Sequence, residues 1–213
     1  DKAVCDGTSN SSIYQDISGV ENNTYKIIVT VSSYQSGTLQ IGGSTNNLEV
    51  TSNGTFIYYR KWTSDSLLYL KSKSGDGFTG SISNISVKEV GQDWTLGSGW
   101  SIGDNKAICD GSQTGNTGLQ QSGVGVSGKI YKIQFDLTVD AGFINYVNLG
   151  GWIDNTNLTT SNTYTYYTTT TINTDNLGIS GDSNFVGSVD NVSVKEVGQG
   201  FTFGDGWSVG DVG

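Results

Sequence analysis

Apolar and polar residues alternate with a period of two along two long segments of the chain. In each segment every second residue is apolar or aromatic, at Tyr25, Ile27, Val29 and Val31 in the first and at Tyr131, Ile133, Phe135 and Leu137 in the second. Successive side chains of a β-strand point to opposite faces, so the alternation predicts two half-buried strands with these side chains inside.

Shorter runs of the same kind are separated by turns rich in Gly, Asn, Ser and Asp. In the first half of the chain they predict further strands near 2–6, 11–18, 36–42, 54–60, 66–72 and 80–89, with counterparts in the second half. Many short antiparallel strands with tight turns are typical of a two-sheet sandwich of jelly-roll or immunoglobulin type. The predicted fold class is therefore all-β, with tandem antiparallel β-sandwich domains.

An internal repeat divides the chain. The segment 85–92, Ile-Ser-Val-Lys-Glu-Val-Gly-Gln, returns almost unchanged at 192–199, and Lys-Ala-Val-Cys-Asp-Gly at 2–7 returns as Lys-Ala-Ile-Cys-Asp-Gly at 106–111. Such self-similarity at a fixed spacing indicates tandem copies of one structural unit, here of about 105 residues.

The chain and its repeat do not begin at the same point. Gly-Trp-Ser-Ile-Gly-Asp at 99–104 precedes the second Lys-Ala-x-Cys-Asp-Gly, and Gly-Trp-Ser-Val-Gly-Asp at 206–211 follows the second repeat. We expect repeat one at 1–92 without its first strand, a complete repeat two at 93–199, and at 200–213 the first strand of a further repeat or a donor segment. The chain is then either a window of a longer array or a subunit whose segment with Phe201, Phe203 and Trp207 completes a neighbour.

Composition supports strands over helices. The chain has 31 Gly, no Pro, and 11 Tyr, 7 Phe and 5 Trp, so a core can form from a few large aromatic side chains. The net charge of −9 repels phosphate backbones, which argues against nucleic acid as a partner. No apolar run is long enough to span a bilayer, no signal peptide is recognisable, and we expect the chain to be a piece of a longer protein.

The residue inventory excludes much catalytic chemistry. Without any His, neither a Ser-His-Asp nor a Cys-His arrangement nor an imidazole metal site can form. A pair of carboxylates would still permit a glycosidase, but the four Glu form no promising pair, and we predict a non-enzymatic protein without a cofactor. Asp76 and Asp182, in Gly- and Ser-rich turns, are weak candidates for a structural Ca²⁺. Cys5 and Cys109 occupy equivalent places in the two repeats, too far apart for a disulfide, and we expect both to be reduced and buried.

The repeat separates two groups of aromatic residues. Aromatics shared by both copies are assigned to the core, and they are the pairs Tyr25/Tyr131, Phe56/Tyr164, Tyr58/Tyr166, Tyr59/Tyr167, Phe78/Phe185 and Trp100/Trp207. Five aromatics without an aromatic counterpart fall near turns or on polar strand faces, and they are Trp62, Tyr69, Phe143, Tyr146 and Trp152. Exposed Trp and Tyr rings stack on the apolar faces of sugars, so the four Trp and Tyr residues of this set are the candidate carbohydrate-binding residues; packing within a local loop is the alternative.

The ordered motifs resemble a known family. Gly-Trp-Ser-Ile-Gly-Asp, Ala-Ile-Cys-Asp-Gly, a strand opening with Tyr-Lys-Ile, a Gly-Gly pair and the closing Gly-Ser-Val-Asp-Asn-Val-Ser-Val-Lys-Glu-Val at 187–197 are similar to jelly-roll carbohydrate-binding modules. More narrowly, they resemble tandem copies of such modules in tail, fibre and other virion structural proteins of bacteriophages, marine ones included. Repeat one departs from the pattern at Ser83, where repeat two has Asp190. The resemblance implies a jelly-roll fold and a sugar-binding ancestry.

Three functions follow from these observations. The chain is a virion-surface or extracellular adhesion module that binds surface glycans weakly and multivalently, a structural spacer that has lost its ligand, or a subunit of an extracellular filament assembled by strand donation without a sugar ligand. Its partners are then other copies of itself, other virion proteins or a cell-surface glycan. We favour the first of the three.

Overall fold

The computed structural model describes residues 2–44, 47–63, 66–154, 156–171, 176–199, 201 and 204–210. The chain divides into two compact units, unit 1 (Asp1–Gln92) and unit 2 (Asp93–Gly213). Every regular element in the described residues is a β-strand, and every pair of named strands is antiparallel. None of the described segments forms a helix long and apolar enough to cross a membrane.

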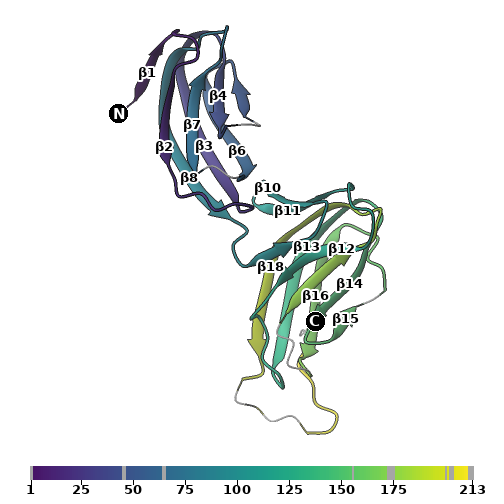
Figure 1. Ribbon diagram of the computed structural model, residues 1–213. Helices are drawn as coiled ribbons and strands as arrows, with labels where there is room; N and C mark the ends of the chain where they lie inside the picture. The colour runs from purple at the N-terminus through teal and green to yellow at the C-terminus, as the bar shows by residue number, and fades with distance from the viewer. Residues whose placement is uncertain are drawn as a thin grey trace. The chain divides into compact units, whose positions relative to one another are not determined.

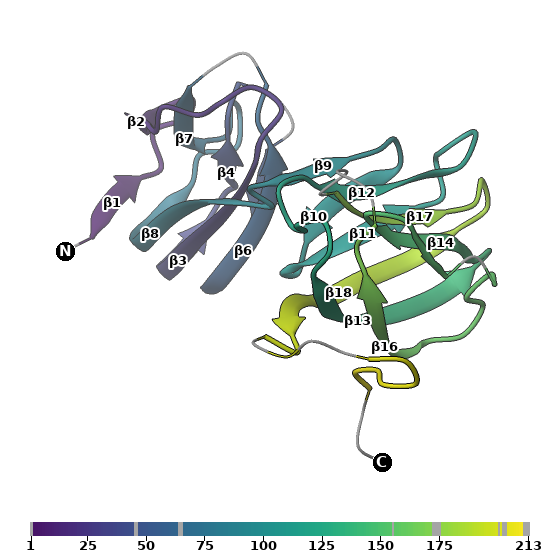
Figure 2. The same ribbon diagram turned by 90° about the horizontal axis from the view of Figure 1, so that it is seen from below.

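Unit 1 is a sandwich of two four-stranded sheets, ordered β1-β8-β3-β6 and β2-β7-β4-β5 (Figure 1). Its strands are β1 (Ala3–Asp6), β2 (Ser12–Asp16), β3 (Thr24–Ser36), β4 (Leu39–Gly42), β5 (Leu48–Val50), β6 (Gly54–Lys61), β7 (Leu67–Ser72) and β8 (Thr79–Val90). Figure 2 shows β8, β3 and β6 side by side in the order in which they are hydrogen-bonded.

Unit 2 repeats this arrangement with one more strand in each sheet, in the orders β10-β11-β18-β13-β16 and β15-β14-β17-β12-β9. Its strands are β9 (Trp94–Leu96), β10 (Trp100–Gly103), β11 (Lys106–Asp110), β12 (Thr117–Gln121), β13 (Ile130–Ala141), β14 (Ile144–Leu149), β15 (Trp152–Asp154), β16 (Asn162–Thr169), β17 (Leu177–Gly181) and β18 (Val186–Val197). The extra strands are β9 and β10.

Each unit has its own hydrophobic core between its two sheets. The alternating residues of β3 are 6% exposed or less, at Tyr25, Ile27, Val29 and Val31, and those of β13 are 5% exposed or less, at Tyr131, Ile133, Phe135 and Leu137. Phe78 and Phe185 are fully buried at equivalent places. The predicted all-β sandwich fold and the predicted inward faces of the two long strands are confirmed.

The closing segment of each repeat is one strand of the longest strand pairing of its unit. It forms β8 in unit 1 and β18 in unit 2, and both pairings contain a β-bulge, at Ile28/Thr30 and at Gln134/Asp136. Opposite each bulge an Asn takes a left-handed backbone, Asn84 with φ 49° and Asn191 with φ 51°. Asn tolerates this conformation better than other non-Gly residues, which accounts for the Asn in the repeated motif. Strands β5 and β15, only three residues each, were not predicted.

Candidate functional site

The sheet β2-β7-β4-β5 of unit 1 carries Tyr69 on its outer face. Leu68 and Leu70 on either side of it in β7 are 2% and 5% exposed, because they enter the core. Since alternate residues of a strand face opposite sides, Tyr69 faces away from the core and is half-buried among its neighbours on the surface. Tyr69, one of the two predicted sugar-binding residues of unit 1, therefore lies where a ligand can reach it.

Tyr14 of β2 lies directly beside Tyr69. The two residues are opposite each other in the β2–β7 register, their ring centroids are 5.7 Å apart, and the planes are tilted by 40°. Tyr14 is 66% exposed, and on the other side of Tyr69 the register places Gly42, which has no side chain. We call Tyr14 and Tyr69 the tyrosine pair; it forms an aromatic patch on the outer face of the sheet.

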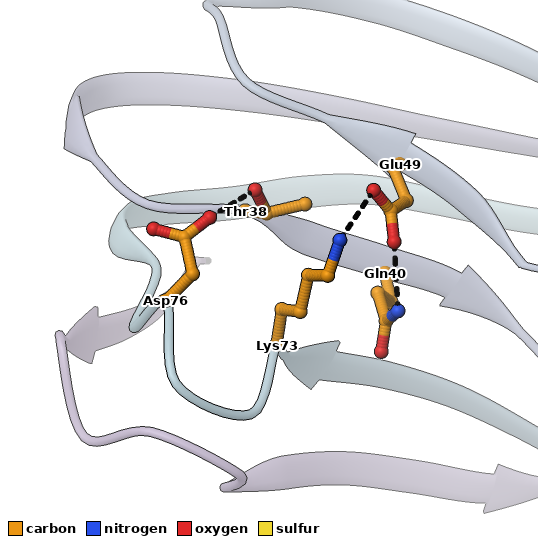
Figure 3. A network of polar contacts seen from close by, with 5 residues as sticks. All are labelled: Thr38, Gln40, Glu49, Lys73 and Asp76. Carbon is orange, nitrogen blue, oxygen red and sulfur yellow. Dashed lines mark hydrogen bonds and ion pairs between the residues drawn. The ribbon is translucent and has the colours of Figure 1, made fainter.

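A row of polar residues runs beside the tyrosine pair. Ser12, Lys71, Gln40 and Glu49 are successive partners across β2, β7, β4 and β5. Gln40 donates a hydrogen bond to Glu49 at 2.9 Å, and Lys73 Nζ forms an ion pair with the other Glu49 oxygen at 2.8 Å (Figure 3). The hydrogen bond from Lys73 and, to a smaller extent, that from Gln40 hold the pKa of Glu49 below its ordinary value. The carboxylate therefore stays ionised and accepts hydrogen bonds.

Unit 2 presents a different set of residues on the corresponding sheet. Thr95, Gln120, Gly178, Asn148 and Trp152 are successive partners across its strands, and Tyr146 lies half-buried two residues before Asn148. The Asn148 amide lies over Gly178, where a Cβ would come within 2.3 Å of its oxygen. The Trp152 side chain lies outside the described part of the structure. Unit 2 therefore combines one tyrosine with amide groups instead of a tyrosine pair.

The prediction that Trp62 binds a ligand is wrong. Its side chain is 0% exposed and lies in the core of unit 1, edge-on to Tyr25 at 5.4 Å, with the Arg60 guanidinium 5.1 Å from its ring. Trp62 N donates to Asn23 O at 2.8 Å, and in unit 2 Thr170 N donates to Lys129 O at 3.0 Å in the equivalent place. Trp62 has no aromatic counterpart because a buried Thr fills the same position in unit 2.

Two further assignments of aromatic residues need correction. Tyr59 and Tyr167 belong to neither core: each faces outward from its sheet, with Lys26 or Lys132 5.6 Å from the ring centroid. Trp207 is 77% exposed, whereas its counterpart Trp100 is 7% exposed. Phe201 is also exposed, at 76%, and Phe203 lies outside the described residues.

The two candidate Ca²⁺ residues hold turns together through protein hydrogen bonds. Asp76 accepts from the Thr38 hydroxyl at 2.5 Å (Figure 3), and Asp182 accepts from Phe143 N at 3.0 Å and from the Asn184 amide at 3.3 Å. Among the described residues no group of three or more His, Cys, Asp or Glu gathers around either of them.

Cys5 and Cys109 form no disulfide with each other, and they differ in burial. Cys109 is 1% exposed, and its burial is the main cause of the raised pKa of its thiol. Cys5 is only half-buried, contrary to expectation. The difference arises because Trp100 pairs with Cys109 in unit 2, while no described strand pairs with that side of Cys5.

Tyr14 is the site residue that sequence reasoning missed. It stands in a predicted strand among polar residues, Ser12-Ile-Tyr-Gln-Asp16, and the same criterion that selected Tyr69 would have selected it. Their pairing is a matter of register between β2 and β7, which the sequence does not reveal.

No known protein family matches the chain, and no curated protein matches it. Among solved structures the chain is similar to the N-terminal CBM22-1-CBM22-2 tandem domain of Xyn10C from Paenibacillus barcinonensis, with a TM-score of 0.35 and 11% sequence identity. The match covers 91% of this chain and 85% of that one.

Proposed function

We propose that the chain is a non-catalytic adhesion module that binds glycans on the outer face of its β2-β7-β4-β5 sheet. The observation that carries the proposal is the tyrosine pair, two adjacent aromatic rings 5.7 Å apart with Tyr14 66% exposed. Tyrosine rings offer apolar faces to the C–H groups of a sugar together with a polar hydroxyl.

The polar row supplies the complementary hydrogen-bonding groups. Ser12 and Gln40 both donate and accept, Lys71 donates, and the ionised Glu49 accepts. Sugar hydroxyls need donors and acceptors in turn, and this row provides both, with Ser12 and Lys71 two residues from Tyr14 and Tyr69 on the same strands. The net charge of −9 disfavours anionic polysaccharides, so the proposed ligand is a neutral glycan.

Since the proposed site offers only two aromatic rings, we propose that binding at each site is weak. Two sandwich units in one chain, and many chains on one surface, raise the overall avidity without new contacts if the linkage lets sites engage together. We propose display on a virion surface or another extracellular surface, in a fibre, tail or capsid decoration; the sequence resemblance to bacteriophage structural proteins supports this setting.

A glycan array tests the proposal directly. The full chain is applied alongside a Tyr14→Ala/Tyr69→Ala variant, and Tyr59→Ala, which removes an outward-facing tyrosine of the other sheet, is the matched control. We expect the unaltered chain and the control to bind the same neutral glycans and the double variant to lose at least about tenfold in affinity, since about 1.4 kcal/mol of lost stacking has that effect. Equal binding by the double variant, or no binding by the unaltered chain, would contradict the proposal.

A further inference from the structure

The outer face of the sheet β10-β11-β18-β13-β16 in unit 2 carries two rows of like charges. In the basic row Lys195 of β18 lies opposite Lys132 of β13, and in the acidic row Asp190 lies opposite Asp136 on the same two strands. The intervening residues of β13 enter the core, so both rows face away from it. Figure 2 shows β18, β13 and β16 side by side in the order in which they are hydrogen-bonded.

Strand β16 extends both rows with uncharged side chains. Tyr167 lies opposite Lys132, with the Lys132 ammonium 5.6 Å from the centre of its ring, and Thr163 lies opposite Asp136. Lys132 and Asp136 are four residues apart on β13, so the two rows are separated by about 13 Å at about 3.3 Å per residue. Between them lies an uncharged row, formed by Ser193, Gln134 and Thr165.

This arrangement of charges is unfavourable in a single copy of the chain. Like charges directly opposite each other on neighbouring strands repel, whereas a Lys opposite an Asp would attract. Hydrogen bonds from Thr163 and Asn191 hold the pKa of Asp136 below its ordinary value, so this carboxylate stays ionised at neutral pH beside Asp190. Charges of one sign are therefore concentrated at each end of the face.

Unit 1 has the basic row but not the acidic one. Lys88 of β8 lies opposite Lys26 of β3, and the Lys26 ammonium is 5.6 Å from the centre of the Tyr59 ring, as in unit 2. In place of the two Asp residues unit 1 has Ser83 and Thr30, which lie opposite each other. The fold therefore does not require the acidic row, and the combination of both rows is a property of unit 2.

We propose that this face of unit 2 binds the same face of a second copy of the chain. A two-fold axis along the uncharged row reverses the strand direction, so it places the basic row of each copy over the acidic row of the other. The axis keeps each strand opposite its own copy. Lys132 then faces the partner subunit's Asp136, and Lys195 faces the partner subunit's Asp190, so each like-charge row gains opposite charges.

Charge complementarity selects this arrangement and limits its strength. A two-fold axis along the strands would instead set the two basic rows against each other. Exposed ion pairs contribute little affinity, and the net charge of −9 opposes association at long range, so the dimer is weak. The inference is independent of glycan binding, because the tyrosine pair lies in unit 1.

Charge reversal in the full chain tests the arrangement by sedimentation equilibrium at physiological salt. The acidic variant is Lys132→Glu/Lys195→Glu and the basic variant is Asp136→Lys/Asp190→Lys, and none of these four side chains belongs to the core. We expect the unaltered chain to form dimers as its concentration rises. Each variant alone should dimerise at least about tenfold more weakly, because like charges then meet across the interface. An equimolar mixture of the two variants should dimerise again, because an acidic face then meets a basic one.

Two further variants separate the proposal from general effects of charge and folding. Lys26→Glu/Lys88→Glu makes the same charge change in unit 1, and this matched control should weaken dimerisation far less than the acidic variant does. Asp136→Thr/Asp190→Ser introduces the residues that unit 1 has at these places, so it suits the fold, and it should also weaken dimerisation.

The basic variant gives the sharpest contrast, because its net negative charge is smaller than that of the unaltered chain. If net charge alone governed association, this variant by itself would associate more tightly. Tighter association of the basic variant alone, a monomer of the unaltered chain at every concentration, or no dimer in the mixture would each overturn the proposal.

Discussion

At the scale of single residues, Trp62 and Thr170 show how the same core position accepts different side chains. Both are almost completely buried, and both make the same backbone hydrogen bonds. The sequence identified Trp62 as distinctive but could not tell a core residue from a surface one, because strand alternation ends before Trp62. Tyr69 lies outward because it alternates with Leu68 and Leu70 inside β7.

Trp62→Ala should lower the stability of unit 1, because Trp62 is a core residue and not a ligand-binding one. Truncating a fully buried Trp costs about 3–5 kcal/mol, since it leaves a cavity against Tyr25 and Arg60. Urea unfolding followed by circular dichroism should show the loss, while Tyr14→Ala, at a 66% exposed position, should change the midpoint little. Equal stability of Trp62→Ala and the unaltered chain would contradict the core assignment.

Between acid and neutral pH, stability should change with pH only in the acid range. Hydrogen bonds lower the pKa of four carboxyl groups: that of Asp6 through Thr8, of Asp110 through Ser112, of Asp136 through Thr163 and Asn191, and of Glu49 through Lys73 and Gln40. A lowered folded-state pKa stabilises the fold above the ordinary carboxyl value of about 4, and this stabilisation is lost as the pH falls through the folded-state pKa. The chain has no His. We expect a flat urea midpoint from pH 5 to 7 and a decline below about pH 4; a decline between pH 5 and 7 would contradict this explanation.

At the scale of elements, the strands that alternation marks clearly were predictable, and two of the three-residue strands were not. The inward residues of β3 and β13 follow from period two alone, whereas β5 and β15 have three residues each and show no period. The register that joins Tyr14 to Tyr69 depends on turn geometry and on packing, so the candidate site could be predicted only in part.

The segments with Trp100 and Trp207 provide a matched pair for mutation. Trp100 is 7% exposed and stacked on Phe185, while Trp207 is 77% exposed. In dilute solution Trp100→Ala should destabilise unit 2 by about 3–5 kcal/mol, and Trp207→Ala should leave both units unchanged. Urea titrations at micromolar concentration provide the comparison. A large effect of Trp207→Ala under these conditions would mean that the residue packs within its own chain.

At the scale of the whole molecule, the two units have the same topology. In the described residues β1 and β2 are edge strands of unit 1, whereas β11 and β12 of unit 2 are paired on both sides. Amides at an unpaired sheet edge open to solvent more readily than those within a sheet. In dilute solution, hydrogen exchange measured by mass spectrometry should therefore be faster in β1 and β2 than in β11 and β12. Equal protection of the two sets would contradict the position of β1 and β2 at the edges of their sheets in the described residues.

An NMR titration of the isotope-labelled full chain tests most directly whether the tyrosine pair binds a glycan. The probe is a neutral oligosaccharide bound on the array, added until the shifts saturate. We predict that the perturbed amides cluster in β2, β7 and β4 around Tyr14 and Tyr69, which lie opposite each other in register. Perturbations confined to the other sheet of unit 1, or no perturbation at saturating sugar, would contradict the account.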